Sequence, residues 1–119
     1  MKTILVAEDN AVNRELMKEI LEAANYNVLE AVDGADALAM LTKCQPNVIL
    51  LDIQMPVMDG RETIRRIRDN PDWRHLPVIA CTAFAMRGER EEIMRLGFNG
   101  YLAKPISLPD LLFAIRQAD

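Results

Sequence analysis

Long apolar runs are missing from this sequence. Its apolar stretches are far shorter than the roughly 20 residues that a membrane-spanning helix needs. The first of them, at residues 3–7, is followed at once by Glu8 and Asp9, which leaves no room for the apolar region of a secretory signal peptide. We therefore expect a cytoplasmic protein with no membrane partner.

Cysteine, histidine and excess positive charge are also scarce. Two cysteines, Cys44 and Cys81, and the single His75 are too few for a disulfide framework or a zinc cluster of cysteine and histidine. The net charge of −4 lacks the basic excess of a nucleic-acid-binding domain, so no direct nucleic-acid partner is expected. Half of the residues are apolar, which is enough for a core, and 119 residues are typical of a single domain, here 1–119.

Short β-type runs alternate with amphipathic helical patterns along the whole chain. The runs that predict strands lie at residues 3–7, 26–31, 47–51, 78–81 and 99–102. Helices are predicted after Asn10, from Asp33, over 61–68 with Asp59 as the cap, over 87–96 with Gly97 at the end, and after Ser107. Continuous apolar strands that alternate with helices indicate a doubly wound α/β fold, with a five-stranded parallel sheet covered on both faces by five helices.

Polar residues follow four of the predicted strands. Glu8 and Asp9 come after the first strand, Asp52 after the third, Thr82 after the fourth and Lys104 after the fifth. Since parallel strands end at the same edge of a sheet, we expect these side chains to lie together. Three close carboxylates repel one another and call for a cation, and oxygen ligands suit Mg²⁺ or Mn²⁺. A metal, a hydroxyl, an ammonium and the isolated Asp52 as nucleophile are the parts of a phosphoryl-transfer site.

These residues, in this order and at these separations, resemble the response regulator receiver domain, the CheY-like family. The resemblance covers essentially the whole chain and rests on four segments. They are the acidic pair Glu8-Asp9, LLDIQMPVMDG with Asp52, ACTA with Thr82, and YLAKPIS with Lys104. The resemblance implies the flavodoxin-like strand order 2-1-3-4-5, which the periodicity of the sequence does not reveal.

The resemblance also implies a phosphoacceptor and a metal site. Asp52 would take a phosphoryl group from a phosphohistidine of a histidine kinase or a histidine phosphotransfer protein. Asp9 and Asp52 would bind Mg²⁺ directly, Gln54 would add its backbone carbonyl, and Glu8 would act largely through water. The chain would then be a signalling domain that catalyses only its own phosphorylation and dephosphorylation, and not an enzyme with turnover.

A switch is implied by the remaining motif residues. Thr82 would bind a phosphoryl oxygen, Lys104 would pair with the phosphate across a cis peptide bond to Pro105, and Tyr101 would be the switch aromatic. Phosphorylation would reshape the face made by the fourth helix, fifth strand and fifth helix, where a downstream protein docks. The chain would be a monomer or a weak phosphorylation-dependent dimer.

Several alternatives stay open or are disfavoured by the residues. The segment EDNAVNRELM resembles the receivers of hybrid histidine kinases, so the chain is alternatively such a receiver, acting as an intermediate in a phosphorelay. A metal-dependent phosphatase would need Asp-x-Asp after the first strand and a cap insertion. A flavodoxin-like redox protein would not place carboxylates where the FMN phosphate binds. The first helix, with Ala11, Asn13 and Arg14, is a candidate surface for the phosphodonor.

Overall fold

Five parallel strands form the centre of the molecule. The computed structural model describes residues 1–83 and 88–118. The strands lie in the order β2-β1-β3-β4-β5, which confirms the order 2-1-3-4-5, and all their pairings are parallel. Their bounds are Thr3–Ala7 (β1), Asn27–Ala31 (β2), Val48–Asp52 (β3), Val78–Thr82 (β4) and Gly100–Ala103 (β5).

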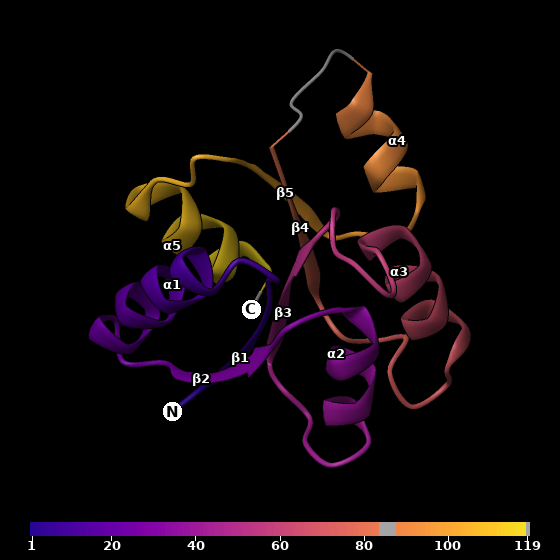
Figure 1. The fold of residues 1–119 in the computed structure, drawn as a ribbon, viewed down its shortest axis with the longest axis horizontal. Coiled ribbons are helices and arrows are strands. Elements are labelled where there is room, and N and C mark those ends of the chain that lie inside the picture. Colours follow the sequence, from indigo (N-terminus) through magenta and orange to yellow (C-terminus); the bar gives the residue numbers. More distant parts are fainter. Residues whose placement is uncertain (84–87, 119) are drawn as a thin grey trace.

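Helices cover both faces of this sheet, as the alternation of elements predicts (Figure 1). Helices α1 and α5 lie on one face, and α2, α3 and α4 lie on the other. The helix bounds are Ala11–Ala23 (α1), Gly34–Leu41 (α2), Gly60–Asp69 (α3), Glu89–Arg95 (α4) and Leu108–Ala118 (α5). In the described parts of the chain, none of these helices has the length and apolarity that a bilayer crossing requires.

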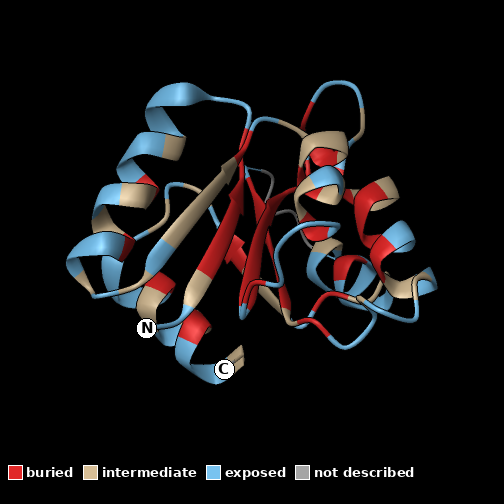
Figure 2. Ribbon diagram, turned by 90° about the horizontal axis from the view of Figure 1, so that it is seen from below, coloured by how far each residue is buried: buried red, intermediate tan, exposed pale blue. Residues whose placement is uncertain are grey.

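Alternate residues of the central strands serve the two faces. Ile49 and Leu51 of β3 join the core under α2, α3 and α4, while Val48 and Leu50 join the core under α1 and α5. Strands β3 and β4 are buried along their whole length, and β2 at the edge is mostly half-buried (Figure 2). The continuous apolar runs of the sequence thus correspond to strands that are covered on both sides.

Side-chain caps begin three of the helices at the residues that the sequence predicts. Asn10 accepts a hydrogen bond from the Asn13 amide at 3.0 Å, and Asp59 accepts one from the Glu62 amide at 3.0 Å. Asp33 caps α2 in the same way, at 2.7 Å from the Asp36 amide. These bonds satisfy amide groups that the first turn of a helix leaves without partners.

Several predicted boundaries are wrong by one or two residues. Asp52 and Thr82 are the last residues of β3 and β4 rather than the first residues after them, because each still pairs with the neighbouring strand. Helix α4 begins at Glu89, and Arg87, where the helix was predicted to start, lies outside the described residues. Because Asp52 and Thr82 pair with neighbouring strands, the sheet fixes the backbone positions from which both side chains extend.

The loop after β3 returns to the strand at Gly60. The Gly60 amide donates to the Ile53 carbonyl at 2.8 Å. A Cβ atom on Gly60 would lie 2.6 Å from the Asp52 carbonyl oxygen and 2.7 Å from the Ile53 Cα. Both neighbours are backbone atoms, so neither can turn away as a flexible side chain would. The absence of a side chain at Gly60 therefore permits the close approach of α3 to the end of β3.

Gly60→Ala should destabilise the protein by about 2 kcal/mol, because the new methyl group forces the backbone at Asp52 to move. The gain in helix propensity, up to about 1 kcal/mol, acts in the opposite direction and is outweighed. Gly100→Ala is the control, since its Cβ would meet the Ile79 side chain at an ordinary 3.5 Å. Urea denaturation measures both, and equal stabilities of the two variants would contradict the steric explanation.

Candidate functional site

The carboxyl edge of the sheet brings together the residues that the sequence places at the strand ends. Glu8 follows β1, Asp52 ends β3, Thr82 ends β4 and Lys104 follows β5. The register aligns Asp52 with Cys81, so Asp52 and Thr82 lie on neighbouring strands one residue apart along the sheet. The predicted cluster therefore forms from segments that are far apart in the sequence.

The Lys104 ammonium lies between two buried carboxylates. Its Nζ donates to Asp52 Oδ2 at 2.8 Å and to Glu8 Oε2 at 2.9 Å. Burial acts to lower the pKa of Lys104, but the hydrogen bonds to Asp52 and Glu8 outweigh it and raise that pKa. The Lys104–Pro105 peptide bond is cis, as the resemblance implies, and the Lys104 amide donates to the Thr82 carbonyl at 2.8 Å. The ammonium is thus held in its charged form beside Asp52.

Asp52 has both of its carboxylate oxygens engaged. Oδ2 accepts from Lys104, and Oδ1 accepts from the Gln54 backbone amide at 3.1 Å. The side chain is 5% exposed. Gln54 lies in the loop after β3, in the position that the sequence predicts, and its side chain is exposed at the edge of the cleft described below.

Glu8, Asp9 and Asp52 form a group of carboxylates that suits a hard cation. One oxygen of each lies within 4.8 Å of the others. Burial raises the pKa of Glu8 to about 7, from a usual value of 4.5, and the neighbouring Asp52 adds to this shift. Asp9 is exposed, so a cation can reach the group from solvent. These oxygen ligands suit Mg²⁺, and binding of the cation would reduce the repulsion among the carboxylates.

Two residues of α1 hold Glu8 in place. Arg14 Nη1 donates to the Glu8 carbonyl at 2.8 Å, and Asn13 Nδ2 lies 3.5 Å from Glu8 Oε1. Arg14 also pairs with Glu30 of β2, at 3.5 Å. Asn13 and Arg14, which the sequence offers only as surface residues for a partner, therefore also contact Glu8.

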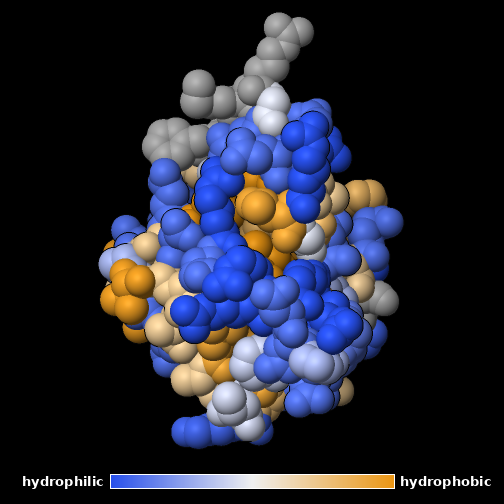
Figure 3. Space-filling model, turned by 90° about the vertical axis from the view of Figure 1, so that its right-hand side faces the viewer, coloured by the Kyte–Doolittle hydropathy of each residue, from blue (hydrophilic) through white to orange (hydrophobic). Residues whose placement is uncertain are grey.

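A cleft opens beside Asp52 between the β3–α3 loop and α4. Its volume is about 920 Å³. Seen from the side on which α3 and α4 lie, apolar surface is recessed among strongly hydrophilic side chains (Figure 3). The cleft is lined by Asp9, Ile53, Gln54, Met55, Pro56, Asp59, Arg61, Thr82, Gly88, Glu89 and Glu92.

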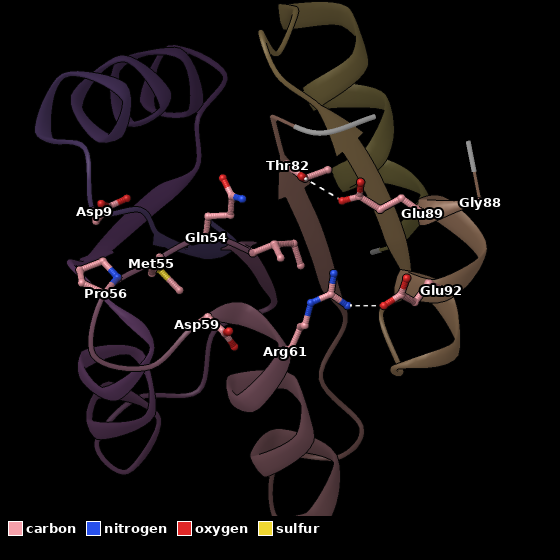
Figure 4. A pocket seen from close by; sticks show the side chains of 11 residues that line it. Asp9, Gln54, Met55, Pro56, Asp59, Arg61, Thr82, Gly88, Glu89 and Glu92 are labelled. Carbon is pink, nitrogen blue, oxygen red and sulfur yellow. Dashed lines mark hydrogen bonds and ion pairs between the residues drawn. The ribbon is translucent and has the colours of Figure 1, made fainter. Parts of the chain in front are cut away.

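Glu89 is a residue of this cleft that sequence reasoning missed. The Thr82 hydroxyl donates to Glu89 Oε1 at 3.2 Å, and Arg61 Nη1 bonds Glu92 Oε1 at 2.8 Å (Figure 4). The first turn of α4 contains three glutamates, and favourable interaction with the helix dipole explains acidic residues there without any role in the site. That pattern in the sequence does not tell which of the three faces Thr82.

Tyr101 lies on β5, half-buried, in register with Ala80 of β4. Burial raises the pKa of its phenol, and the charge of Glu89 adds to the shift while Arg90 opposes it. The charges of Glu89 and Arg90 in the first turn of α4 thus act on Tyr101.

Comparison with known proteins places this fold and site in a class. The model of the response regulator receiver domain matches residues 4–116, and the chain belongs to that family. It is therefore a receiver domain of two-component signalling, a class of phosphoacceptor domains rather than of turnover enzymes.

Particular relatives narrow the comparison. The chain is 38% identical, over 98% of its length and 94% of the relative's, to the polar-differentiation response regulator DivK of Brucella anthropi. It is 35% identical, with a TM-score of 0.90, to the receiver domain of the sensor histidine kinase PA1611 from Pseudomonas aeruginosa, and the match covers 98% of this chain and 95% of that one. The PA1611 structure holds a magnesium ion in its active-site cleft. The chemotaxis response regulator CheY4 of Vibrio cholerae is 29% identical, with a TM-score of 0.93 and coverage of 100% and 99%.

Glu8→Gln should stabilise the metal-free protein by about 2 kcal/mol at pH 8 and by little at pH 4.5. The folded state binds the Glu8 proton more tightly than the unfolded state, so the wild type loses stability as the pH rises from 4.5 to about 7. A neutral amide at position 8 removes that loss. Urea denaturation in EDTA across this pH range measures the difference.

The control for this experiment is Glu19→Gln, which neutralises an exposed carboxylate of α1. Its stability relative to the wild type should stay within about 0.5 kcal/mol at every pH. A Glu8→Gln effect of the same size at pH 4.5 and pH 8 would contradict the raised pKa as the cause.

Proposed function

We propose that Asp52 accepts a phosphoryl group from a phosphohistidine of a histidine kinase or a histidine phosphotransfer protein, in a Mg²⁺-dependent step. The observation that carries this proposal is the placement of Lys104 Nζ 2.8 Å from the buried Asp52 carboxylate, beside the acidic pair Glu8-Asp9. A carboxylate, a fixed ammonium and a metal-binding group around one point are suited to phosphoryl transfer.

The chain's own residues divide the work of this transfer. A carboxylate oxygen of Asp52 forms the new O–P bond while the P–N bond of the donor breaks, and the electron pair of that bond returns to the imidazole. Lys104 pairs with the phosphoryl oxygens as negative charge gathers there, and Thr82 donates its hydroxyl to one of them. Asp52 and Lys104 are in contact before the donor arrives, which lowers the cost of assembling the transition state.

Asp9 and Asp52 would hold the metal directly, with Gln54 through its carbonyl and Glu8 through water. When bound, Mg²⁺ would neutralise the crowded carboxylates and the phosphoryl oxygens. Because Asp52 is itself the acceptor, the chain catalyses its own phosphorylation and dephosphorylation and has no separate substrate to turn over.

The output is a change in the face formed by α4, β5 and α5. An aspartyl phosphate carries roughly 1.5 to 2 negative charges, by analogy with other phosphorylated side chains, in place of the single charge of the Asp52 carboxylate, so up to about one negative charge is gained beside Thr82. Moving a two-state equilibrium from 1:99 to 99:1 needs about 5.5 kcal/mol. Charge-assisted hydrogen bonds from Lys104 and Thr82 can supply a large part of it. Tyr101 is half-buried on β5 and would turn inward as Thr82 moves.

The phosphodonor would dock on α1. Val12 and Leu16 of this helix are 77% and 54% exposed. Leu16 also borders an apolar groove of about 400 Å³ that reaches Lys104 and Ile106. Exposed apolar side chains beside the reacting groups suit the helical surface of a partner.

A phosphorelay intermediate within a hybrid histidine kinase is the second candidate. The similarity to the receiver domain of the sensor histidine kinase PA1611 supports it. The two candidates share the chemistry at Asp52 and differ in the protein that takes the phosphoryl group onward.

Asp52→Asn should abolish labelling by acetyl phosphate, because an amide oxygen does not form the acyl phosphate. Removal of Mg²⁺ with EDTA should abolish labelling of the wild type. Asp69→Asn, at an exposed carboxylate at the end of α3, should label at the wild-type rate. Intact-mass spectrometry reads the addition, and labelling that survives Asp52→Asn would overturn the assignment.

Leu16→Lys should slow transfer from a phosphohistidine protein at least tenfold, about 1.4 kcal/mol, because it places a charge in the apolar contact. Labelling by acetyl phosphate, which needs no docking, should stay within about twofold of the wild type. The donor for this assay is the histidine kinase or phosphotransfer protein of the same organism that phosphorylates the wild type fastest. Met94→Lys on α4 is the control, and loss of transfer in that variant alone would place the donor on the other face.

A further inference from the structure

A hydrogen bond connects the end of β4 to the start of α4. The Thr82 hydroxyl, which is fully buried, donates to Glu89 Oε1 at 3.2 Å. Glu89 is half-buried and is the first residue of α4. The two side chains point toward one another on the same side of the cleft, opposite Asp9 and Gln54 (Figure 4).

We propose that Glu89 is a positioning residue that holds the Thr82 hydroxyl in the resting state and releases it when Asp52 carries a phosphoryl group. This inference rests on the proposed function of Asp52. It assigns to the Glu89 carboxylate the role of competing with the phosphoryl group for one donor, so that phosphorylation frees the start of α4.

The competition follows from the donor. A threonine hydroxyl has one proton to donate, so it cannot serve the Glu89 carboxylate and a phosphoryl oxygen at full strength together. Asp52 and Thr82 end neighbouring strands, so a phosphoryl group on Asp52 comes within reach of Thr82. Both acceptors are anions in one cleft, and their repulsion favours departure of Glu89 once the phosphoryl group has taken the hydroxyl.

The surroundings of Glu89 connect this exchange to the output face. Burial raises the pKa of Tyr101 and the Glu89 charge adds to this shift, so the carboxylate that bonds Thr82 also acts electrostatically on Tyr101 of β5. The Arg61 guanidinium, which lines the same cleft, bonds Glu92 at 2.8 Å. Helix α4 is therefore tied to β4 through Glu89 and to α3 through Glu92. Phosphorylation would break the first tie and leave the second.

The first test measures the affinity for beryllofluoride, a mimic of the phosphoryl group, in the presence of Mg²⁺. Glu89→Ala should bind roughly tenfold more tightly than the wild type, because Thr82 no longer has to leave a charged acceptor. Glu89→Gln, which keeps an acceptor but not the charge, should lie between the two. Glu91→Gln is the matched control, since it neutralises an exposed carboxylate in the same helical turn and should stay within about twofold of the wild type.

A double-mutant cycle separates restraint through Thr82 from simple repulsion of the anion. In a Thr82→Val background, Glu89→Ala should change the affinity by less than about twofold, because the hydroxyl that Glu89 holds is gone. An undiminished tenfold gain in that background would mean that the carboxylate repels the anion directly, and it would overturn the inference. Equal affinities of Glu89→Ala and Glu91→Gln would overturn it as well.

A second readout needs neither metal nor beryllofluoride. In the metal-free protein, the methyl NMR signal of Thr82 should shift in Glu89→Ala and stay in place in Glu91→Gln. An unmoved signal in Glu89→Ala would show that the hydrogen bond does not set the resting position of Thr82. Failure of the wild type to bind beryllofluoride would count against the function proposed for Asp52, whereas failure confined to the Glu89 variants would count only against the role of Glu89.

Discussion

The ammonium of Lys104 between the carboxylates of Asp52 and Glu8 is the interaction on which the site depends. Both carboxylates are nearly inaccessible to water, and each lies less than 3 Å from Nζ. Without this cation, two buried negative charges would face one another in a region of low dielectric constant. Even with it, burial and the neighbouring Asp52 keep the pKa of Glu8 raised, at about 7. Because Asp9 adds a third carboxylate, the negative charge of the cluster exceeds what one ammonium compensates. That excess is the reason why a divalent cation and a group with developing negative charge can be accommodated at one point.

The parallel sheet provides the support for this arrangement. Strands β1, β3, β4 and β5 are neighbours, and their carboxyl ends deliver an acidic pair, a carboxylate, a hydroxyl and an ammonium to one edge. Two of the reacting side chains, on Asp52 and Thr82, belong to the ladders themselves, so their backbone positions are held by hydrogen bonds on buried strands. The groups expected to move are the side chains of Thr82 and Tyr101 and the start of α4, which lies outside the ladder. A rigid acceptor beside a movable helix is the physical basis for converting a local charge into a change of surface.

Much of the fold followed from local patterns. The caps at Asn10 and Asp59, and the succession of strands and helices along the chain, are decided by short-range chemistry. Both were predicted correctly. The ends of β3 and β4 were not, because a polar residue such as Asp52 reads as the end of a strand whether or not its backbone pairs further. The start of α4 was also misplaced, since the polar pattern that predicts this helix runs from Arg87, whereas the helix begins at Glu89, after Gly88 in the left-handed conformation.

The sequence by itself determined which chemical groups the site contains, because the residues at the strand ends and their order along the chain are read directly from it. It also determined the class of fold, since the periods of two and 3.6 residues reflect local backbone geometry. Only the tertiary structure decided that Lys104 lies between Glu8 and Asp52, that Arg14 holds the Glu8 carbonyl, and that Glu89 rather than Glu91 or Glu92 faces Thr82. These are contacts between side chains from distant segments, and they depend on the packing of helices against the sheet, which no local pattern encodes.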